Sequence, residues 1–242
     1  MPARPLICVK RKGKSMIKHV FLDLDDTILD FHKAEEVALE KTLRNFSIPP
    51  TEENKALYSR INKGCWEALE RGEITRAELR LLRFERFFSE IGAENAARVP
   101  DVYESFLSQG HYFIPSAEEM LESLFGKFSL YLATNGIAAV QAGRVASAGI
   151  AKYFKERFVS EEIGYNKPSL AYFDACFAKI PGFCREEAVI VGDSLTSDIK
   201  GGMAAGLKTV WFNPKGLAHP ENICPDVEIS DLGDLVGVLE KM

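Results

Sequence analysis

The sequence predicts an α/β fold with a parallel β-sheet, into which an all-helical domain is inserted. Two observations support this prediction. In the C-terminal half of the chain, short apolar runs alternate with helical patterns, which is typical of the βαβ units that build a parallel sheet. Residues 31–110, in contrast, contain no convincing strand, so a block of helices separates the first predicted strand from the second.

Buried strands are predicted where an apolar run is short and lacks polar alternation, because such strands are covered on both faces of a sheet. Four runs meet this description, namely residues 20–22, 130–133, 188–191 and 209–212. Weaker strand patterns occupy residues 157–159 and 227–229. Together with the helices between them, these runs predict a Rossmann-like core of three layers.

Helical patterns lie between the predicted strands. Ser116 and Glu119 form a capping-box pattern, S-x-x-E, which predicts that a helix begins there. A second helix is predicted from about residue 137 to 148, and a third begins near Ser169. A fourth covers roughly residues 197–205 and ends before a glycine that is expected to cap it.

The helical block is divided by a Pro-Pro pair at residues 49–50, by Gly72 and by Gly92, which predicts about four helices. A second capping-box pattern, T-x-x-E at residues 75–78, predicts the start of one of them. This organisation gives three predicted parts: a basic leader at residues 1–15, a core at residues 16–30 and 111–242, and a helical domain at residues 31–110.

Composition and charge narrow the class of protein. The 242 residues suffice for two modest domains, and the formal net charge of −5 argues against a nucleic-acid binder. No apolar run approaches the roughly 20 residues that span a bilayer, so no membrane partner is expected. Five scattered cysteines without a C-x-x-C pair indicate reduced thiols in a cytoplasmic protein. The apolar stretch in the leader is too short for a signal peptide.

Polar residues follow three of the predicted strands at the point where each strand ends. The first strand runs into Asp23 and Asp25, the second into Thr134 and Asn135, and a later one into Asp193. Ligands of an open α/β sheet bind beyond the carboxyl ends of its strands. We therefore expect these side chains to line one crevice.

The aspartates of this crevice predict a metal ion. Asp23 and Asp25 are two residues apart, so on an extended chain their side chains share a face, and Asp193 arrives from another strand. Three carboxylates would repel one another unless a cation lay between them. Because no His or Cys accompanies them, Mg²⁺ is expected rather than zinc. Aspartates after strands often cap helices or begin turns, and for Asp193 taken alone that interpretation is about as good as a catalytic one.

The same crevice contains groups that bind anions. Thr134 supplies a hydroxyl, and the backbone of Asn135 and Gly136 can present N–H donors at a helix start. Lys167 comes directly before Pro168, which fixes the chain direction at the start of a predicted helix. A divalent ion, a lysine and a hydroxyl together predict a phosphate site. Alone, the lysine is typical of an exposed surface residue and the Thr-Asn-Gly sequence of a turn.

These residues resemble the motifs of the haloacid dehalogenase superfamily. The sequence DLDDT at residues 23–27 matches its first motif, D-x-D-x-T, and GDSLTSD at residues 192–198 matches its fourth, G-D-x-x-x-x-D. Thr134 matches the Ser or Thr of the second motif, and Lys167 matches the lysine of the third. All four occur in the order found in the family, and this ordered set carries the resemblance.

The resemblance implies a phosphatase reaction. Asp23 would attack phosphorus and form an aspartyl-phosphate, while Asp25 would protonate the leaving oxygen and then deprotonate water. The Asp23 carboxylate, the Asp25 backbone carbonyl and Asp193 would hold Mg²⁺. The substrate would be a small phosphate ester, and either a monomer or a homodimer fits this chemistry.

The resemblance also implies roles for the groups around the reacting carboxylate. Thr134 and Lys167 would bind the transferring phosphoryl group, with Asn135 beside them, and the lysine would stabilise its charge. Asp198 would brace the metal-binding loop without binding the ion. Thr27 would shape the turn after the first strand.

The helical insert resembles the type 1 cap of this superfamily. The sequences NKGCW at residues 62–66, GEIT at 72–75 and RFE at 83–85 are similar to the cap of pyrimidine 5′-nucleotidases. Trp66 could stack on a base, and Lys63 or Arg83 could reach a sugar or phosphate. Each also fits an ordinary structural role, the aromatic residue in a helix core and the charged residues on a solvated face.

The resemblance therefore favours a Mg²⁺-dependent phosphatase acting on pyrimidine nucleoside 5′-monophosphates. Four alternatives stay open. These are a sugar-phosphate or phosphoglycolate phosphatase, a phosphomutase, a metal-independent haloacid dehalogenase, and a binding protein that has kept only the fold.

Overall fold

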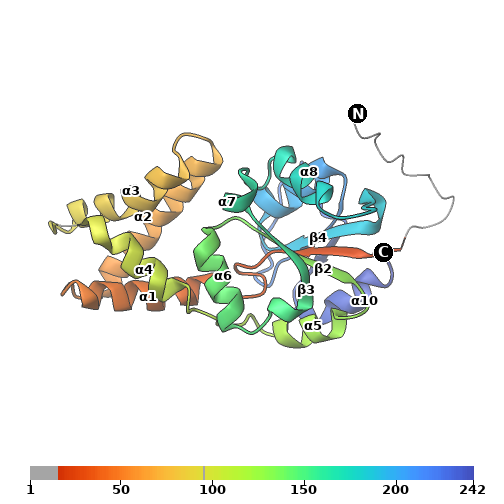
Figure 1. The fold of residues 1–242 in the computed structure, drawn as a ribbon, viewed down its shortest axis with the longest axis horizontal. Coiled ribbons are helices and arrows are strands. Elements are labelled where there is room, and N and C mark those ends of the chain that lie inside the picture. Colours follow the sequence, from red (N-terminus) through yellow and green to blue (C-terminus); the bar gives the residue numbers. More distant parts are fainter. Residues whose placement is uncertain (1–15, 95) are drawn as a thin grey trace. The chain divides into compact units, whose positions relative to one another are not determined.

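A parallel sheet of six strands organises the larger of two units in the computed structural model, which describes residues 16–94 and 96–242 (Figure 1). The predicted leader and Cys8 lie outside the described residues. The larger unit contains residues 16–30, Phe113–Ala138 and Gly149–Met242, and the smaller unit contains Phe31–Tyr112 and Ala139–Ala148.

The strand order is β3-β2-β1-β4-β5-β6, and every neighbouring pair is parallel. The strands are β1 (His19–Leu22), β2 (Ser129–Thr134), β3 (Phe154–Val159), β4 (Ala188–Gly192), β5 (Lys208–Phe212) and β6 (Val227–Ile229). All six predicted strands are therefore confirmed, including the two with weak patterns. Because β1 lies between β2 and β4, the carboxyl ends of these three strands meet at one edge of the sheet.

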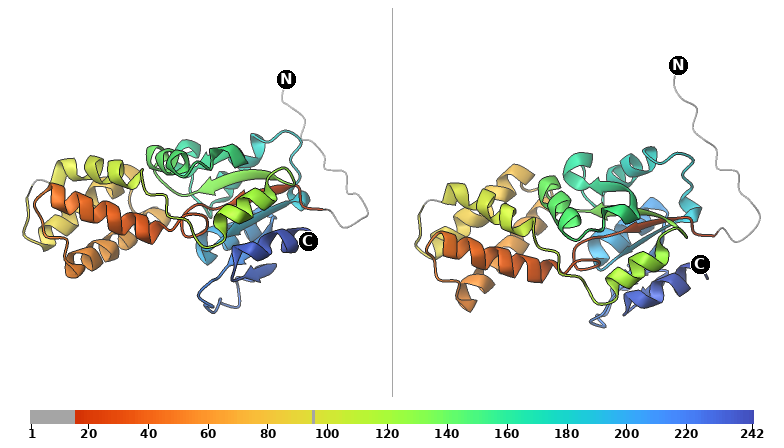
Figure 2. Two further views of the ribbon diagram at one scale, coloured as in Figure 1. Left: turned by 90° about the horizontal axis from the view of Figure 1, so that it is seen from below. Right: turned by 60° about the horizontal axis from the view of Figure 1, so that its bottom comes forward.

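Helices cover both faces of the sheet, as the absence of polar alternation predicts. One face carries α7 (Ser160–Ile163), α8 (Leu170–Ala178) and α9 (Lys200–Ala205) (Figure 1). The other carries α5 (Ala117–Leu124) and α10 (Leu235–Leu239), which pack against each other (Figure 2). The prediction of a three-layer α/β core is confirmed.

An aromatic layer lies between the sheet and α8. Phe21, Tyr131 and Phe158 come from the three neighbouring strands β1, β2 and β3, and their rings stack with centroids 5.1 Å apart for the first pair and 5.9 Å for the second. Phe173 and Phe177 of α8 complete this layer. Such buried rings contribute much of the apolar area of a core. The layer therefore supports the strands that end at the predicted crevice.

The two predicted capping boxes have different outcomes. Thr75 and Glu78 form the box at the start of α3 (Arg76–Glu90), with both reciprocal hydrogen bonds present. Ser116 precedes α5 as predicted, but its φ of 64° is left-handed and its hydroxyl caps no backbone N–H. The capping-box prediction was wrong at Ser116 because its backbone is left-handed, whereas the first residue of a capping box is extended.

The smaller unit is all-helical in its described residues. Its helices are α1 (Phe31–Asn45), α2 (Glu52–Glu70), α3, the short η1 (Ala96–Arg98) and α4 (Val99–Leu107). Tyr58, Phe84, Phe87 and Tyr103 meet in its centre, where the rings of Tyr58 and Phe84 stack at 5.1 Å. The predicted insert of four main helices between the first two strands is confirmed.

Helix α6 (Ala138–Ser147) follows β2 in sequence but packs on the helical unit over most of its length. Arg144 Nε donates to the Gly110 carbonyl at 3.1 Å, and the guanidinium lies over the Phe31 ring at 5.6 Å. Gly143 fits so closely against Ser108 that a Cβ would lie 2.7 Å from the serine Cβ. Residues 139–148 are therefore fastened to both ends of the segment 31–112.

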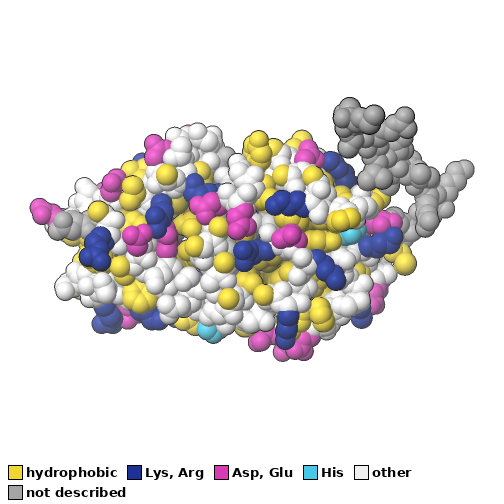
Figure 3. Space-filling view, in the orientation of Figure 1, with side chains coloured by type: hydrophobic (Ala, Val, Ile, Leu, Met, Phe, Trp, Pro, Cys, Tyr) yellow, Lys and Arg dark blue, Asp and Glu magenta, His cyan; other side chains and the backbone are white. Residues whose placement is uncertain are grey.

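Surface charges are mixed on the face drawn in Figure 3, where acidic and basic side chains lie among one another without a continuous basic area. This agrees with the formal net charge of −5. Among the described residues, no helix is both long and apolar enough to cross a bilayer.

Candidate active site

The loop after β1 presents Asp23 at the edge of the sheet. Its backbone N–H donates to the Val191 carbonyl at 3.0 Å, so Asp23 extends the pairing of β1 with β4. The chain then turns, with Ile28 N–H donating to the Leu24 carbonyl at 2.9 Å and Asp26 in the left-handed region at a φ of 57°. Aspartate tolerates this conformation better than most residues. Leu24 and Ile28 are fully buried, which anchors the loop.

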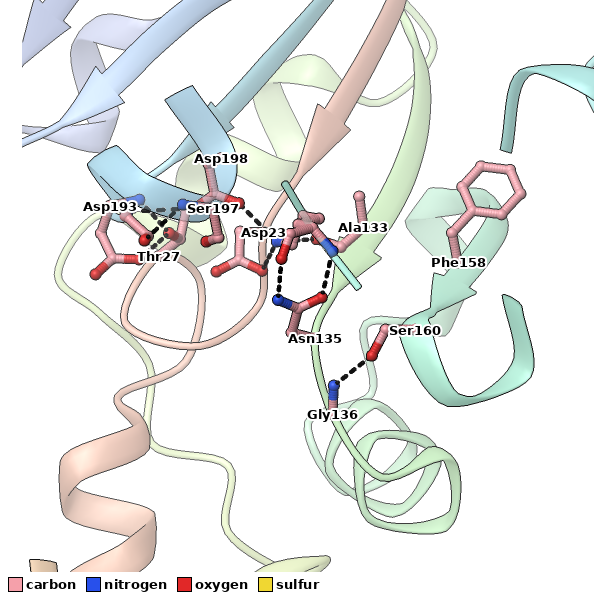
Figure 4. A network of polar contacts seen from close by, with 12 residues as sticks. Asp23, Thr27, Ala133, Asn135, Gly136, Phe158, Ser160, Asp193, Ser197 and Asp198 are labelled. Carbon is pink, nitrogen blue, oxygen red and sulfur yellow. Dashed lines mark hydrogen bonds and ion pairs between the residues drawn. The ribbon is translucent and has the colours of Figure 1, made fainter. Parts of the chain in front are cut away.

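Three aspartate carboxylates gather at this edge (Figure 4). Asp23, Asp193 and Asp198 each offer an oxygen, and these oxygens lie within 4.8 Å of one another. Asp193 follows β4, and Asp198 lies in the π-helical turn η4 (Leu195–Ile199). The structure thus brings Asp23 and Asp193 together. The Asp25 carboxylate is not in this group, and the predicted contribution of its backbone carbonyl stays a prediction.

Lys167 is buried among these carboxylates, with 1% of its surface exposed. Its ammonium donates to Asp23 Oδ1 at 2.7 Å and to Asp198 Oδ1 at 2.6 Å. A third bond, at 2.7 Å, goes to the carbonyl of Ala133 on β2. An ammonium has three N–H donors, and all of them are used within the protein. The alternative of an exposed surface lysine is wrong.

The Asn135 side chain holds the backbone of Lys167. Its Nδ2 donates to the Lys167 carbonyl at 3.0 Å, and its Oδ1 accepts the Lys167 N–H at 2.9 Å (Figure 4). The Gly136 N–H, which we expected to face an anion, donates to Ser160 Oγ at 3.2 Å. Thr134 is fully buried at the end of β2. The side chain of Asn135 thus fixes the position of the lysine.

The backbone of Asp193 is held from both sides. Its N–H donates to Thr27 Oγ1 at 3.1 Å, and Thr27 Oγ1 also donates to the Asp193 carboxylate at 3.4 Å. The Asp193 carbonyl accepts the Trp211 indole N–H at 2.8 Å. Sequence reasoning assigned Thr27 only to the turn and missed Trp211. The first motif contains the threonine, whereas no pattern in the sequence indicates the tryptophan contact.

Asp198 occupies a narrow space inside the π-helical turn. It is fully buried, and its Oδ2 accepts the Ser194 N–H at 3.2 Å. A Cβ at Gly192 would overlap this carboxylate, so the close approach requires glycine. The Ser194 carbonyl accepts the N–H groups of both Asp198 and Ile199, at 3.0 and 3.1 Å. Such π-helical turns are frequent at functional sites.

The electrostatics of the cluster favour a divalent cation. Burial raises the pKa of Asp23, Lys167 lowers it, and Asp198 and Asp193 raise it further, so the pKa lies well above its usual value. Burial, Asp198 and Asp26 raise the pKa of Asp193 to about 7. Burial would lower the pKa of Lys167, but Asp198 and Asp23 outweigh it.

Ionisation of all three carboxylates beside one ammonium would leave two negative charges in a site that is largely removed from water. A hard divalent ion would balance this charge, and carboxylate oxygens are the ligands that Mg²⁺ prefers. The donor set therefore fits the predicted ion.

Comparison with known proteins decides the family. The family model described as haloacid dehalogenase-like hydrolase matches residues 20–212, which run from the second residue of β1 to the end of β5 and include all the residues of the acidic cluster. The chain belongs to the haloacid dehalogenase-like hydrolase family. The resemblance seen in the four sequence motifs is thereby confirmed, and the protein is an enzyme of the hydrolase class.

Relatives within the haloacid dehalogenase-like family match almost the whole chain. The HAD-hydrolase YfnB of Bacillus subtilis is 42% identical over 91% of this chain and 94% of its own. The pyrimidine 5′-nucleotidase PynA of Streptococcus pneumoniae is 37% identical, over 93% and 95% of the two chains. The pyrimidine 5′-nucleotidase YjjG of Escherichia coli is 30% identical, over 92% and 97%.

A crystal structure of YfnB from Bacillus subtilis has the same fold. It aligns with a TM-score of 0.87 at 40% sequence identity, covering 93% of this chain and 99% of that one. The Rossmann-like haloacid dehalogenase fold predicted for this chain is therefore confirmed.

The cap residues singled out by the sequence lie in different surroundings. Arg83 is buried, with 1% of its surface exposed, whereas a solvated position was expected for it. It donates to Asn62 Oδ1 at 3.2 Å and to Glu104 Oε1 at 3.4 Å. Lys63 is exposed, and Trp66 is half-buried with the guanidinium of Arg76 6.0 Å from the centre of its ring. The expectation of a solvated Arg83 was wrong because partners on α2 and α4 pair with it.

Two adjacent glutamates on α1 differ in environment. Glu35 is buried, and its oxygens accept hydrogen bonds from Asn62 Nδ2 at 2.6 Å and from Ser59 Oγ at 3.2 Å. Burial raises the pKa of Glu35 despite these bonds. Glu36 is partly exposed, and hydrogen bonds from Lys33 and Lys55 lower its pKa.

The free energy of unfolding of the wild type is expected to fall above about pH 4.3, the ordinary pKa of glutamate. Glu35→Gln is expected to remove this fall. Because the pKa of Glu35 is raised by folding, the folded state keeps a proton there that the unfolded state has released. Wild-type stability therefore falls as pH rises through that interval. The variant gains stability relative to the wild type over the same interval, which urea unfolding followed by circular dichroism measures.

Glu36→Gln is the matched control on the same helix. Because the pKa of Glu36 is lowered, its contribution to stability is present above about pH 4.3 and is lost as pH falls through the lowered value. This variant is less stable than the wild type at neutral pH, and the gap closes in acid. A Glu35→Gln variant with the same pH dependence as Glu36→Gln would contradict the assignment.

Proposed function

We propose that the protein is a Mg²⁺-dependent phosphatase that hydrolyses small phosphate monoesters through an aspartyl-phosphate on Asp23. The observation that carries this proposal is the position of the Asp23 carboxylate, which contacts Lys167 at 2.7 Å and lies in the acidic cluster with Asp193 and Asp198. One carboxylate is thus next to a fixed ammonium and within reach of a cation. That combination suits nucleophilic attack on a phosphoryl group.

The ion would be held by carboxylate oxygens of Asp23 and Asp193, with the Asp25 backbone carbonyl as a further ligand. Asp198 would keep the loop in place through Lys167 and the Ser194 N–H. When bound, Mg²⁺ supplies positive charge that stabilises the transferring phosphoryl oxygens. The relative YfnB, crystallised with magnesium bound, supports this choice of ion.

In the first step, an oxygen of Asp23 forms a bond to phosphorus while the bond from phosphorus to the ester oxygen breaks. Asp25 gives its proton to the departing oxygen, which leaves as an alcohol. In the second step, Asp25 takes a proton from water, and the resulting hydroxide attacks phosphorus. The bond to Asp23 breaks, inorganic phosphate leaves, and both aspartates return to their starting states.

Thr134 would bind the transferring phosphoryl group, and Lys167 would stabilise its charge. The ammonium carries positive charge at the nucleophile and cannot move away, because Asn135 fixes its backbone and Asp198 fixes its Nζ. Preorganised charge of this kind stabilises a transition state without reorganisation during the reaction. Asn135 would contribute to substrate binding chiefly by holding the lysine in place.

The substrate class we propose is pyrimidine nucleoside 5′-monophosphates. Two relatives that match more than 90% of this chain, PynA and YjjG, are named pyrimidine 5′-nucleotidases. The cap sequences at residues 62–66, 72–75 and 83–85 support the same class. The groups described at the core site recognise phosphate alone, so this substrate class rests on the relatives and on the cap sequences.

Asp23→Asn is expected to lower phosphate release by at least about a thousandfold while leaving the fold intact, because the amide is not a nucleophile but keeps the shape of the side chain. Release from p-nitrophenyl phosphate measures turnover, and circular dichroism measures folding. Asp174→Asn, at an exposed residue of α8, is the matched control and keeps wild-type turnover. Comparable turnover by the Asp23 variant would refute the nucleophile.

Removal of divalent ions with EDTA is expected to abolish phosphate release, and added Mg²⁺ to restore it. The physical reason is that Lys167 alone cannot balance three ionised carboxylates at the acidic cluster, so the ionised form of the site needs a cation. The same colorimetric assay at increasing Mg²⁺ gives the concentration of half-activation. Full activity after exhaustive chelation, or release of halide from a 2-haloacid without metal, would favour a dehalogenase.

A screen of phosphate esters is expected to rank UMP and dUMP above sugar phosphates and phosphoglycolate in kcat/KM. Purine nucleoside monophosphates test whether the cap distinguishes the base, and bisphosphorylated hexoses test for a mutase. If sugar phosphates rank first, the phosphatase chemistry stands but the nucleotidase assignment fails.

A further inference from the structure

We propose that Trp211 is a positioning residue for the divalent-cation site, because its indole N–H fixes the backbone carbonyl of Asp193 while its ring supports the turn that carries Asp198. This inference rests on the proposed Mg²⁺ site. Trp211 lies outside the four motifs, and its side chain touches no reacting atom. Its role would be to set where the acidic oxygens stand before an ion binds.

The first argument is the hydrogen bonding of Asp193. Its N–H is taken by Thr27 Oγ1 at 3.1 Å and its carbonyl by Trp211 Nε1 at 2.8 Å. Both peptide groups beside the Asp193 Cα are therefore held by side chains from other segments, one from the loop after β1 and one from β5. The carboxylate of Asp193 extends from a backbone that has little freedom to rotate. A metal ligand that is already held in position loses little conformational entropy when the ion binds, which favours binding.

The second argument is the packing of the indole ring. Trp211 is 1% exposed and forms a small apolar cluster with Ile199 and Ile223, against which Leu195 packs. Leu195 and Ile199 are the first and last residues of η4, the turn that contains Asp198. Trp211 therefore contacts both segments that follow β4 and carry an acidic residue of the cluster: the one with Asp193 and the turn with Asp198.

The third argument is the position of Trp211 in the sheet. In the pairing of β4 with β5, Gly192 is the partner of Trp211, so the indole begins directly beside the residue that precedes Asp193. Phenylalanine at this position would keep most of the buried ring but would leave the Asp193 carbonyl without its donor. The substitution should therefore disturb the position of the Asp193 carbonyl while most of the apolar packing of the core is kept.

Trp211→Phe is expected to weaken Mg²⁺ binding about tenfold, the usual order for removing a side chain that orients a metal ligand. Isothermal titration of the metal-free full chain with MgCl₂, in the absence of substrate, measures this directly. Excess Mg²⁺ should restore kcat, which a damaged core would not allow. Trp66→Phe, in the helical unit, is the matched control and keeps wild-type Mg²⁺ affinity.

A second measurement needs no change at the site. Trp66 and Trp211 are the two tryptophans of the chain. In the Trp66→Phe protein all tryptophan emission comes from Trp211, so addition of Mg²⁺ should change its intensity or wavelength with the midpoint found by titration. Trp211→Phe, which retains only Trp66, should show no such change.

The outcomes separate this inference from the proposed function. If the wild type binds no Mg²⁺, the proposed metal site fails. If the wild type binds Mg²⁺ and folded Trp211→Phe binds it equally well, the positioning role alone is overturned. An emission from Trp211 that does not respond to saturating Mg²⁺ also overturns it, even if the phenylalanine variant does not fold.

Discussion

The buried ammonium of Lys167 is the interaction on which the rest of the site depends. It joins Asp23 at the end of β1, Ala133 on β2 and Asp198 beyond β4, so three neighbouring segments meet at one charged group. Burial removes the hydration of two carboxylates that also repel each other, and without the ammonium nothing in the cluster would offset this cost. The lysine allows several aspartates to be buried close together in the folded protein. It does not balance all of their negative charge, so a cation can bind.

The parallel sheet explains why these groups meet. Neighbouring strands end at the same edge, and the order β2-β1-β4 brings together residues more than 100 positions apart in the chain. At this edge, hydrogen bonds from side chains fix the backbone of the site residues as well as their side chains. Asn135 holds the main chain of Lys167, and Thr27 and Trp211 hold that of Asp193. Phosphate chemistry relies on such positioning more than on any reactive group.

Sequence reasoning predicted the strands and the meeting of Asp23 with Asp193, because both follow from local apolar pattern and from the geometry of parallel sheets. It failed where a distant partner decides the outcome. The pattern places Arg83 on a solvated face of a helix, whereas Asn62 and Glu104 pair with it in the interior of the helical unit. The contact of Trp211 with Asp193 depends on sheet register, which no local pattern encodes.

The attachment of α6 to the helical unit has a consequence for protein engineering. For an exchange of helical units between relatives, the obvious segment to exchange is the insert between β1 and β2. Arg144 and Gly143 of α6 contact Gly110, Phe31 and Ser108, at the two ends of that insert. A chimaera cut only at residues 31 and 112 would leave a foreign surface against α6, so the transplanted piece should include residues 139–148.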